Sequence, residues 1–199
     1  MRGYCLTEAL LFENRRYFLF DYHIKRLMRS AAYFGVPVVK EGVVWALKAF
    51  PRKLSKGSYK VRLLVDASGK MKVSFAELRR DGPKARLIKA RRPLGASLRI
   101  AFSRITMASN DIFLRHKTTH REIYDREYKK YLKKGFYDVL FFNERGELTE
   151  AHSSNVFIKK NGIFYTPTVS CGLLPARTGS FYWLKAGSTG KRSCAGRIY

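Results

Sequence analysis

The stretch FLRHKTTHREIYD, residues 113–125, gathers five basic side chains within seven positions: Arg115, His116, Lys117, His120 and Arg121. Such a stretch is typical of a solvated cationic strip, and a lone lysine is usually a surface residue. The alternative is one lysine with a chemical task. A free lysine with a pKa of about 10.4 is a poor nucleophile at neutral pH, so that task would require a site that activates it.

Other residues that could do chemistry are scattered. Arg26 lies in HIKRL on an expected helix, Glu150 lies in an expected turn between strands, and Gly-Leu-Leu-Pro at 172–175 precedes an expected helix. Each has a plain alternative: Arg26 as a partly buried salt bridge, Glu150 as a turn residue, and the histidines as structural groups. The sequence has no Walker loop, GxGxxG, HExxH or GxSxG motif, so those chemistries lack local support.

The charge is high but dispersed. Forty Lys and Arg against fifteen Asp and Glu give a net charge of +25 and a pI near 10.3. A basic chain can bind nucleic acid or an acidic membrane, yet these positive charges form no block, and we expect neither partner.

Three cysteines without a CxxC pair predict no zinc site or disulfide framework, and no metal. No apolar run approaches the roughly 20 residues of a membrane span, and no signal peptide is evident, so we expect a cytoplasmic location.

Periodicity predicts the elements of the first half. Residues 5–21 indicate two strands around a turn near Glu13–Asn14, and 21–34 a helix with Asp21 as N-cap and a stop at Gly35. A second helix is expected over residues 41–50 and a hairpin over 59–78 with its turn at Asp66–Gly69.

Strands and helices continue to alternate in the second half. Short strands are expected at 86–89 and 98–102, a helix at 121–132 closed by Gly135, a strand followed by a turn at 143–146, and a hairpin around 161–162. The pattern predicts an α+β protein with two lobes rather than a doubly wound parallel sheet. The expected domains are a small lobe at 1–82, a linker at 83–97, a partial C-terminal lobe at 98–175 and a tail at 176–199.

Four segments in this order resemble a known family: HIKRLMRSAAYFG, LRHKTTHREIYD, GFYDVLFFNERGELTEAHSSN and YTPTVSCGLLP. They are similar to class-IV aminotransferase-type pyridoxal-phosphate enzymes, and most similar to aminodeoxychorismate lyase, especially the lyase half of fused para-aminobenzoate synthases. The resemblance covers about residues 3–175. It implies a two-lobed fold-type IV architecture, like that of D-amino-acid aminotransferase, with the second lobe incomplete. It also implies pyridoxal 5'-phosphate as cofactor and a homodimer.

The resemblance assigns roles by position. Lys117 matches the lysine that forms the Schiff base with the cofactor aldehyde and shuttles protons, and Arg26 the arginine that holds the phosphate. Glu150 matches the carboxylate that faces the pyridine nitrogen, with Asn155 in a supporting role near the ring. Ala176 stands where the family has a glycine at the start of a phosphate-capping helix.

Two further arginines, Arg104 and Arg121, are candidates for binding a substrate carboxylate, with surface cations as the alternative. Ala151 and His152 replace the more usual Gly-Thr or Gly-Ser after the glutamate. After Pro175 the resemblance stops, and residues 176–199 lack helical periodicity. We hypothesise a single-base deletion near codon 176, because a frame shifted by one base permits an amphipathic continuation. The alternative is a genuine divergent C-terminus.

Four functions remain open at this point. The first is a lyase that converts 4-amino-4-deoxychorismate to para-aminobenzoate and pyruvate in the folate pathway, working with a para-aminobenzoate synthase component. The second is a class-IV transaminase for branched-chain or D-amino acids, which shares the cofactor machinery. The third is a basic nucleic-acid-binding protein, and the fourth an inactive remnant of the lyase.

Overall fold

The computed structural model describes residues 3–49, 57–78, 99–160 and 163–175. The linker 83–97, the strand expected at 86–89, the turn at 161–162, and the tail 176–199 with Ala176 lie outside the described residues. Helices and antiparallel strand pairs alternate, which confirms the α+β class. The elements are β1 (Leu6–Glu13), β2 (Arg16–Tyr17), α1 (Phe20–Phe34), α2 (Lys40–Ala49), β3 (Tyr59–Val65), β4 (Met71–Glu77), β5 (Ile100–Met107), η2 (Ile112–Arg115), α4 (Glu122–Leu132), β6 (Asp138–Asn143), β7 (Leu148–Ala151), β8 (Ile158–Lys160), β9 (Ile163–Tyr165) and η3 (Val169–Cys171).

The chain divides into two compact units, Met1–Arg91 with His116–His120, and Arg92–Arg115 with Arg121–Tyr199. The sequence assigned residues 98–175 to a single lobe, whereas the five-residue segment His116–His120 belongs with the first unit. Lys117 therefore lies in the first unit, and Arg121, four residues later in the chain, lies in the second.

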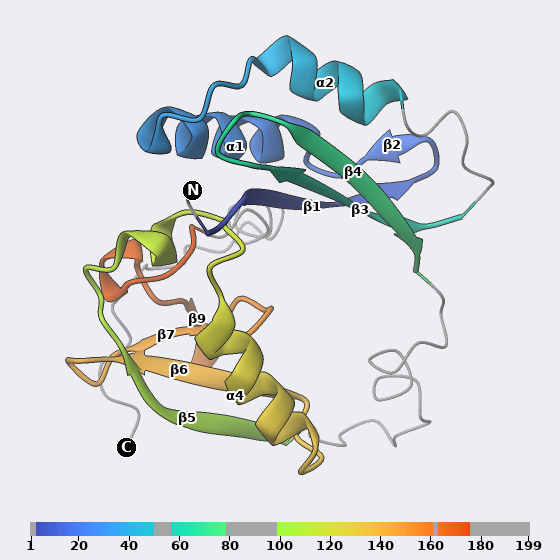
Figure 1. Ribbon diagram of the computed structural model, residues 1–199. Coiled ribbons are helices and arrows are strands. Elements are labelled where there is room, and N and C mark those ends of the chain that lie inside the picture. Colours follow the sequence, from blue (N-terminus) through green and yellow to red (C-terminus); the bar gives the residue numbers. More distant parts are fainter. Residues whose placement is uncertain (1–2, 50–56, 79–98, 161–162, 176–199) are drawn as a thin grey trace. The chain divides into compact units, whose positions relative to one another are not determined.

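The first unit is an antiparallel sheet covered on one face by two helices (Figure 1). The strand order is β2-β1-β3-β4, and Leu6 pairs with Val65 while Leu10 pairs with Val61. These four side chains are buried, because alternate residues of a strand point to the same face. They meet the apolar stripe of α1, whose buried residues include Ile24, Leu27, Ala31 and Phe34.

Helix α1 ends as the sequence predicts but begins differently. Gly35 takes a left-handed conformation at the C-cap, with φ at 62°, and its N–H reaches the carbonyls of Ala31 and Ala32. Asp21 is not the N-cap, so that prediction was wrong. Leu19 occupies the N-cap, also left-handed, and gives no side-chain hydrogen bond. Asp21 lies in the first turn instead, where a carboxylate interacts favourably with the helix dipole.

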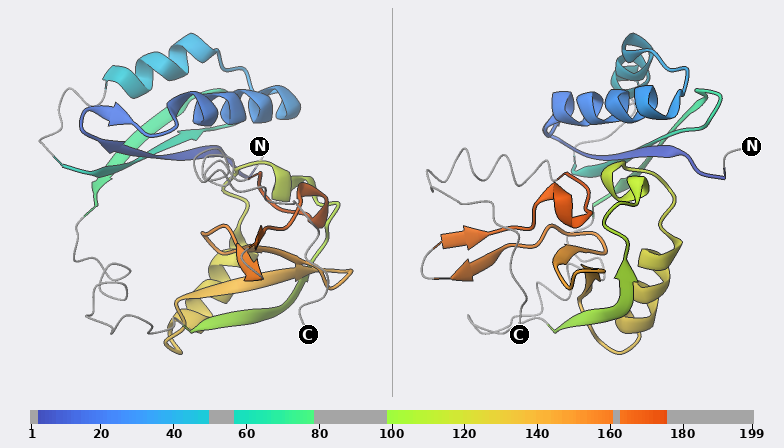
Figure 2. Two further views of the ribbon diagram at one scale, coloured as in Figure 1. Left: turned by 180° about the vertical axis from the view of Figure 1, so that it is seen from behind. Right: turned by 90° about the vertical axis from the view of Figure 1, so that its left-hand side faces the viewer.

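The second unit combines both kinds of strand pairing. β5 runs parallel to β6, and β7 runs antiparallel to β6 (Figure 2). The strand expected at 98–102 begins and ends later, at Ile100–Met107. Helix α4 packs on this sheet, with Tyr124 against Phe141 at 4.4 Å between ring centroids. One parallel pair with a helix in the connection does not make a doubly wound sheet, in agreement with the sequence analysis.

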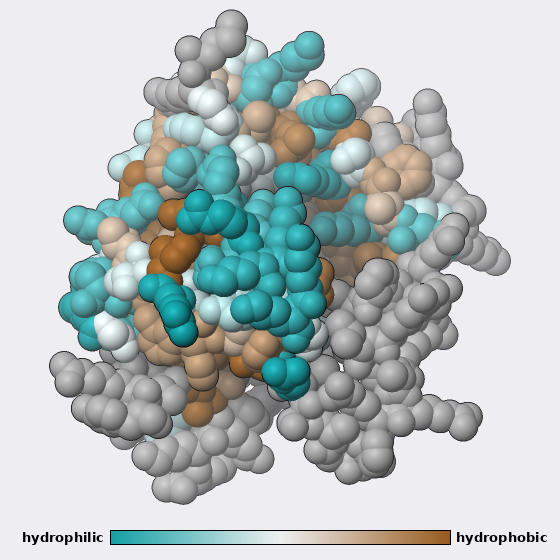
Figure 3. All heavy atoms as spheres, turned by 60° about the horizontal axis from the view of Figure 1, so that its bottom comes forward, coloured by the Kyte–Doolittle hydropathy of each residue, from teal (hydrophilic) through white to brown (hydrophobic). Residues whose placement is uncertain are grey.

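The later turns of α4 and the residues that follow it expose several cations. Arg126, Lys130, Lys133 and Lys134 are exposed on the helix or directly after it, and the ammonium groups of Lys130 and Lys134 lie over the Tyr131 ring. Figure 3 shows, on one face of the molecule, hydrophilic side chains over much of the described surface with apolar ones between them. Within the described residues, none of the helices is both long enough and apolar enough to span a bilayer.

Two glycines of the first unit give a matched test of packing. Gly69 in the β3–β4 turn has φ at 83°, and a Cβ there would lie 2.1 Å from the Pro37 carbonyl oxygen. Gly35 has φ at 62° with open space around it. We expect Gly35→Ala to cost about 1 kcal/mol from backbone strain alone, and Gly69→Ala about 2–4 kcal/mol because the clash adds to the strain. Urea unfolding of both variants measures this difference, and equal losses would contradict it.

Candidate functional site

The backbone around Lys117 is fixed by pairing with the edge of β1. The Thr7 N–H donates to the Lys117 carbonyl oxygen, and the Thr119 N–H donates to the Cys5 carbonyl oxygen, each at 2.9 Å. The Cys5 N–H in turn donates to the Thr119 hydroxyl at 2.9 Å. β2 pairs with the other end of the same strand, at Phe12 and Glu13, so the segment around Lys117 fills an edge that would otherwise lack partners.

His116 anchors the same segment to helix α1. Its ring is buried, Nδ1 lies 2.9 Å from the Ser30 hydroxyl, and the ring stacks on Tyr33 at 4.6 Å between centroids. This arrangement agrees with the expectation that His116 is structural. Lys117 thus follows a fixed side chain and precedes the buried Thr118, which leaves its main chain little freedom.

Arg26 is buried in a bidentate ion pair that involves Glu8. Its Nε donates to Glu8 Oε1 at 2.7 Å, and its Nη2 donates to Glu8 Oε2 at 2.6 Å. His23 Nδ1 also lies 2.7 Å from Oε2. Burial opposes the charge on Glu8, but the hydrogen bonds from Arg26 and His23 outweigh it, so the pKa of Glu8 lies below its ordinary value. The salt-bridge interpretation of Arg26 is therefore correct.

The ion pair limits what Arg26 can offer to a phosphate. Its Nε and Nη2 are committed to Glu8, whereas Nη1, with two hydrogens, makes no hydrogen bond to the residues described. A phosphate oxygen can therefore be held through Nη1, rather than by the two-nitrogen fork that an unpaired guanidinium presents. Glu8 also fixes the plane of the guanidinium, so the direction of that donor is set in advance.

In the second unit, Glu150 lies within β7 and is buried, so its placement in a turn was wrong. Leu140 pairs with Ala151 and Phe142 with Leu148, with a shift of register between them. Between these pairs β6 has the single residue Phe141, and β7 has two, Thr149 and Glu150. This is the arrangement of a β-bulge, which commonly re-aims a side chain beside an active site.

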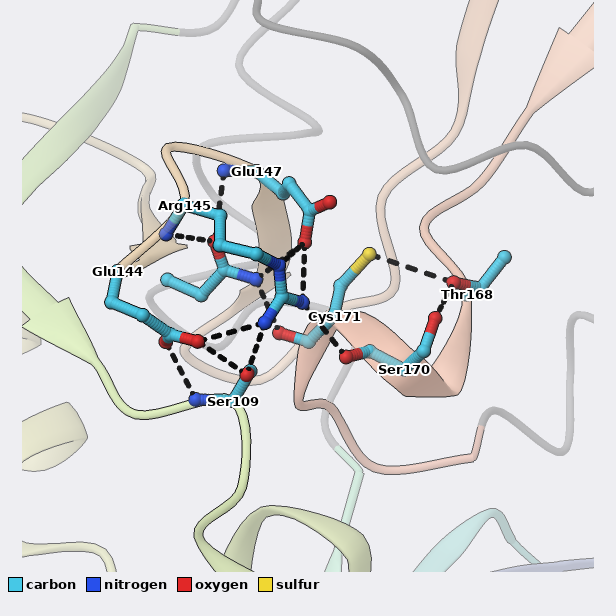
Figure 4. Close-up of polar contacts among 8 residues, drawn as sticks. Ser109, Glu144, Arg145, Glu147, Thr168, Ser170 and Cys171 are labelled. Carbon is cyan, nitrogen blue, oxygen red and sulfur yellow. Dashed lines mark hydrogen bonds and ion pairs between the residues drawn. The ribbon is translucent and has the colours of Figure 1, made fainter.

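A network of polar contacts joins the β6–β7 turn to the loops on either side of it (Figure 4). The Asn143 amide nitrogen donates to the Cys171 carbonyl oxygen at 3.0 Å, and Arg145 Nη2 donates to the Ser170 carbonyl oxygen at 3.0 Å. Arg145 Nη1 also reaches the Ser109 hydroxyl at 2.6 Å. Hydrogen bonds from Ser109 lower the pKa of Glu144 to about 2, so this carboxylate stays charged.

This network sets the path of the Gly-Leu-Leu-Pro segment toward Glu150. Cys171, which accepts the Asn143 hydrogen bond, comes directly before Gly172. Two residues further on, the Leu174 N–H donates to Glu150 Oε2 at 3.4 Å. The backbone of this segment therefore supplies a donor to the carboxylate, a role that the sequence did not indicate.

The two candidate substrate arginines differ in their surroundings. Arg121 Nη2 donates to the His152 carbonyl oxygen, and its guanidinium lies 4.4 Å from the centroid of the Tyr124 ring. Arg104 is exposed on β5, and Asn155 is also exposed. The structure thus groups Lys117 with Arg26 in the first unit, and Glu150 with Arg121 in the second. The roles of all these residues stay predictions.

Sequence reasoning missed three residues of these sites: Glu8, Tyr124 and Arg145. For Glu8 a signal was available, because alternation along β1 places it on the same face as Leu6 and Leu10. A carboxylate on a buried face requires a cation, and Arg26 lies among the apolar residues of α1.

No group of His, Cys, Asp and Glu within the described residues is arranged to hold a metal ion.

Comparison with known proteins adds an independent line of evidence. The family model of amino-transferase class IV matches residues 6–178. A structure from Mesorhizobium loti, provisionally designated an amino-acid aminotransferase, has 26% identity and a TM-score of 0.78, and the match covers 96% of this chain and 86% of that one. No curated protein matches this sequence.

Two further structures share the fold at lower identity. One from Legionella pneumophila, provisionally designated a 4-amino-4-deoxychorismate lyase, has 19% identity and a TM-score of 0.75, covering 94% of this chain and 72% of that one. A hypothetical aminotransferase from Mycobacterium tuberculosis, bound to α-ketoglutarate and PMP, has 19% identity and a TM-score of 0.79, covering 96% and 71%.

The pair of Glu8 and Arg26 predicts a specific pH dependence. Because the pKa of Glu8 is lowered from 4.5 in the fold, the ion pair stabilises the protein above about pH 4.5, and this is lost as the pH falls through the folded pKa. We expect Glu8→Gln to lose about 3 kcal/mol at pH 7, because Arg26 is left buried without its counter-charge. The difference from the wild type should shrink on acidification. Urea unfolding between pH 7 and pH 3 measures it, with the exposed Glu41→Gln as control; a difference independent of pH would contradict the prediction.

Asn143 is the buried centre of the turn network, because its Oδ1 accepts from the Arg145 and Glu147 N–H groups while its nitrogen donates to Cys171. Asn143→Asp keeps the acceptor and removes the donor, which leaves the Cys171 carbonyl without that partner and sets a negative charge against Glu147 Oε2, which accepts from the same nitrogen at 2.7 Å. We expect a loss of about 2 kcal/mol in unfolding free energy. Asn110→Asp, at an exposed position, is the control, and equal effects of the two substitutions would show that the network contributes nothing.

Proposed function

The chain belongs to the class IV aminotransferase family, and we propose that it is a lyase that converts 4-amino-4-deoxychorismate to para-aminobenzoate and pyruvate. The family depends on pyridoxal 5'-phosphate, and related structures are described in PLP-bound and PMP-bound forms. The match over residues 6–178 is the observation that carries an enzymatic function. The lyase reaction itself is supported by the likeness of HKTTHR and NERGELTE to the lyase sequences.

Observations at three of the assigned residues support the proposed cofactor. Lys117 lies on a main chain fixed by β1, the strand that also carries the partner of Arg26. Arg26 retains Nη1 as a donor for a phosphate oxygen, and a guanidinium is a strong phosphate ligand. Glu150 is a buried carboxylate at a β-bulge, with a backbone N–H directed at Oε2. In the proposal, this carboxylate pairs with the protonated ring nitrogen of the cofactor.

When bound, the cofactor supplies an electron sink for the charge that develops on the substrate carbon. In the proposal, the amine of Lys117 holds the cofactor through its aldehyde carbon. When free of the cofactor, this amine would accept the proton from the substrate carbon that bears the amine. Arg26 anchors the phosphate end, and Glu150 keeps the ring nitrogen protonated. The ring would become aromatic as the enolpyruvyl group leaves, and that group would take up the proton held by Lys117 and become pyruvate.

A second candidate is an amino-acid aminotransferase. It is favoured by the structure from Mesorhizobium loti, whose identity of 26% exceeds that of the Legionella structure at 19%. The same three residues would serve both reactions, and the fate of the substrate separates them. We also propose, on the family resemblance, that the protein is a cytoplasmic homodimer that works with a para-aminobenzoate synthase component.

Lys117→Ala tests the cofactor assignment. We expect the wild-type chain to show a visible absorbance band when mixed with pyridoxal phosphate, and borohydride to fix the cofactor on Lys117, located by peptide mass spectrometry. Lys117→Ala should lose both the band and the labelled peptide, because the bond to the aldehyde carbon requires this amine. Lys133→Ala, at an exposed position after α4, is the control and should keep both. Label distributed evenly over many lysines would contradict the assignment.

The same preparation separates the two reactions. Release of pyruvate from 4-amino-4-deoxychorismate indicates the lyase. Conversion of the bound cofactor to its pyridoxamine form by an amino acid, without pyruvate release from 4-amino-4-deoxychorismate, indicates the aminotransferase and overturns the lyase proposal.

A further inference from the structure

His23 is the third group at the ion pair of Glu8 and Arg26. Its Nδ1 lies 2.7 Å from Glu8 Oε2, the oxygen that also accepts from Arg26 Nη2 at 2.6 Å. Because the pKa of Glu8 is lowered, its carboxylate is ionised at neutral pH and can only accept hydrogen bonds. Nδ1 therefore carries a hydrogen and donates it. The 3.5 Å between Nδ1 and Arg26 Nη2 then separates two donors that share one acceptor.

The position of His23 follows from the helix that carries it. His23 and Arg26 are three residues apart on α1, a spacing that places two side chains on the same face of a helix. Glu8 reaches this face from β1, where it lies on the same side of the strand as Leu6 and Leu10. The side chains of His23, Arg26 and Glu8 are only 12%, 6% and 2% exposed, so water competes little for their hydrogen bonds.

A carboxylate can pair with a guanidinium along either of two edges. One edge presents Nε and Nη2, the other presents Nη1 and Nη2, and each can donate two hydrogen bonds. Glu8 takes the first edge of Arg26, which leaves Nη1 and its two hydrogens without a hydrogen bond in the part of the chain that the structure describes. On the second edge, Glu8 would occupy both terminal nitrogens. The choice of edge thus decides whether Arg26 has a terminal nitrogen for an anionic ligand.

The hydrogen bond from His23 favours the first edge. A carboxylate that moved to the second edge would exchange the donor Nε for Nη1, so the ion pair itself would keep two hydrogen bonds. The same movement would take Oε2 away from His23 Nδ1, which now lies 2.7 Å from it. Leaving a largely buried donor without an acceptor costs free energy. His23 therefore decides between two pairings that are otherwise similar in strength.

We propose that His23 is a positioning residue for the cofactor phosphate: by holding Glu8 on the Nε and Nη2 edge of Arg26, it keeps Nη1 available as the phosphate donor. The inference rests on the proposed function, because Arg26 is assigned there to the phosphate. His23 acts through Glu8 rather than on the ligand, so its removal should weaken only the binding that depends on the phosphate group.

The test compares pyridoxal phosphate with pyridoxal, which lacks the phosphate, by titration of the visible absorbance band. His23→Phe keeps a ring and removes the donor, and His23→Leu is a second variant without the donor. In both, the dissociation constant for pyridoxal phosphate should rise about tenfold, the effect of one hydrogen bond to a charged group. The dissociation constant for pyridoxal should change by less than about twofold, because Nη1 has no part in its binding.

Two further variants serve as rescue and control. His23→Asn places an amide N–H near the position of Nδ1, so it should keep an affinity for pyridoxal phosphate close to that of the wild type. Lys25→Ala, at an exposed position of the same helix, should change neither dissociation constant.

Three results would overturn the proposal: equal losses of affinity for the two ligands, which indicate that His23 only supports the fold; unchanged pyridoxal phosphate binding in His23→Phe and His23→Leu; or binding by His23→Asn as weak as theirs. Each of these would leave the proposed function intact. Failure of the wild-type chain to bind pyridoxal phosphate would overturn the proposed function and this inference together.

Discussion

The pairing of residues 117–119 with the edge of β1 is the constraint on which the first unit's site depends. Lys117 is remote in sequence from β1, yet its carbonyl oxygen accepts the Thr7 N–H. The next residue of that strand, Glu8, holds Arg26. Two adjacent positions of one strand thus fix the main chain of the candidate cofactor lysine and the guanidinium of the candidate phosphate ligand. A loss of pairing at this edge would release the main chain of Lys117, whereas Glu8 would still be held by the pairing of β1 with β3.

Glu8 has a double effect on such a site. It stabilises the guanidinium of Arg26, because burying that positive charge without a counter-charge would cost free energy of folding. It also occupies two of the three nitrogens that could bind a phosphate. Arg26 therefore has a structural role in the ion pair, and only its Nη1 remains to bind a phosphate. A single donor such as Nη1 contributes less binding energy than two guanidinium nitrogens would. Because the side chain is already held in place, it loses little conformational entropy when the ligand binds.

The second unit uses a different device, an irregularity in a sheet. A regular β7 would pair with β6 residue by residue, whereas at the bulge two consecutive residues, Thr149 and Glu150, lie opposite the single residue Phe141. The network of Asn143 and Arg145 then directs the following loop so that the Leu174 N–H meets Glu150. Rigid support from a turn and a fixed loop holds a carboxylate more reproducibly than an exposed loop would.

The sequence by itself determined the element types, most of the turns and the family. Helices over 20–34 and 122–132 and the turns at Asp66–Gly69 and Asn143–Gly146 follow from local periodicity and turn residues, whose hydrogen bonds lie within a few positions. It did not determine the N-cap of α1, where Leu19 rather than Asp21 stands, or the strand that holds Glu150. Only the tertiary structure decided the partners: Glu8 for Arg26, β1 for Lys117, and Phe141 for Tyr124. These contacts join residues far apart in the chain, and no local pattern specifies which distant group will meet a buried charge.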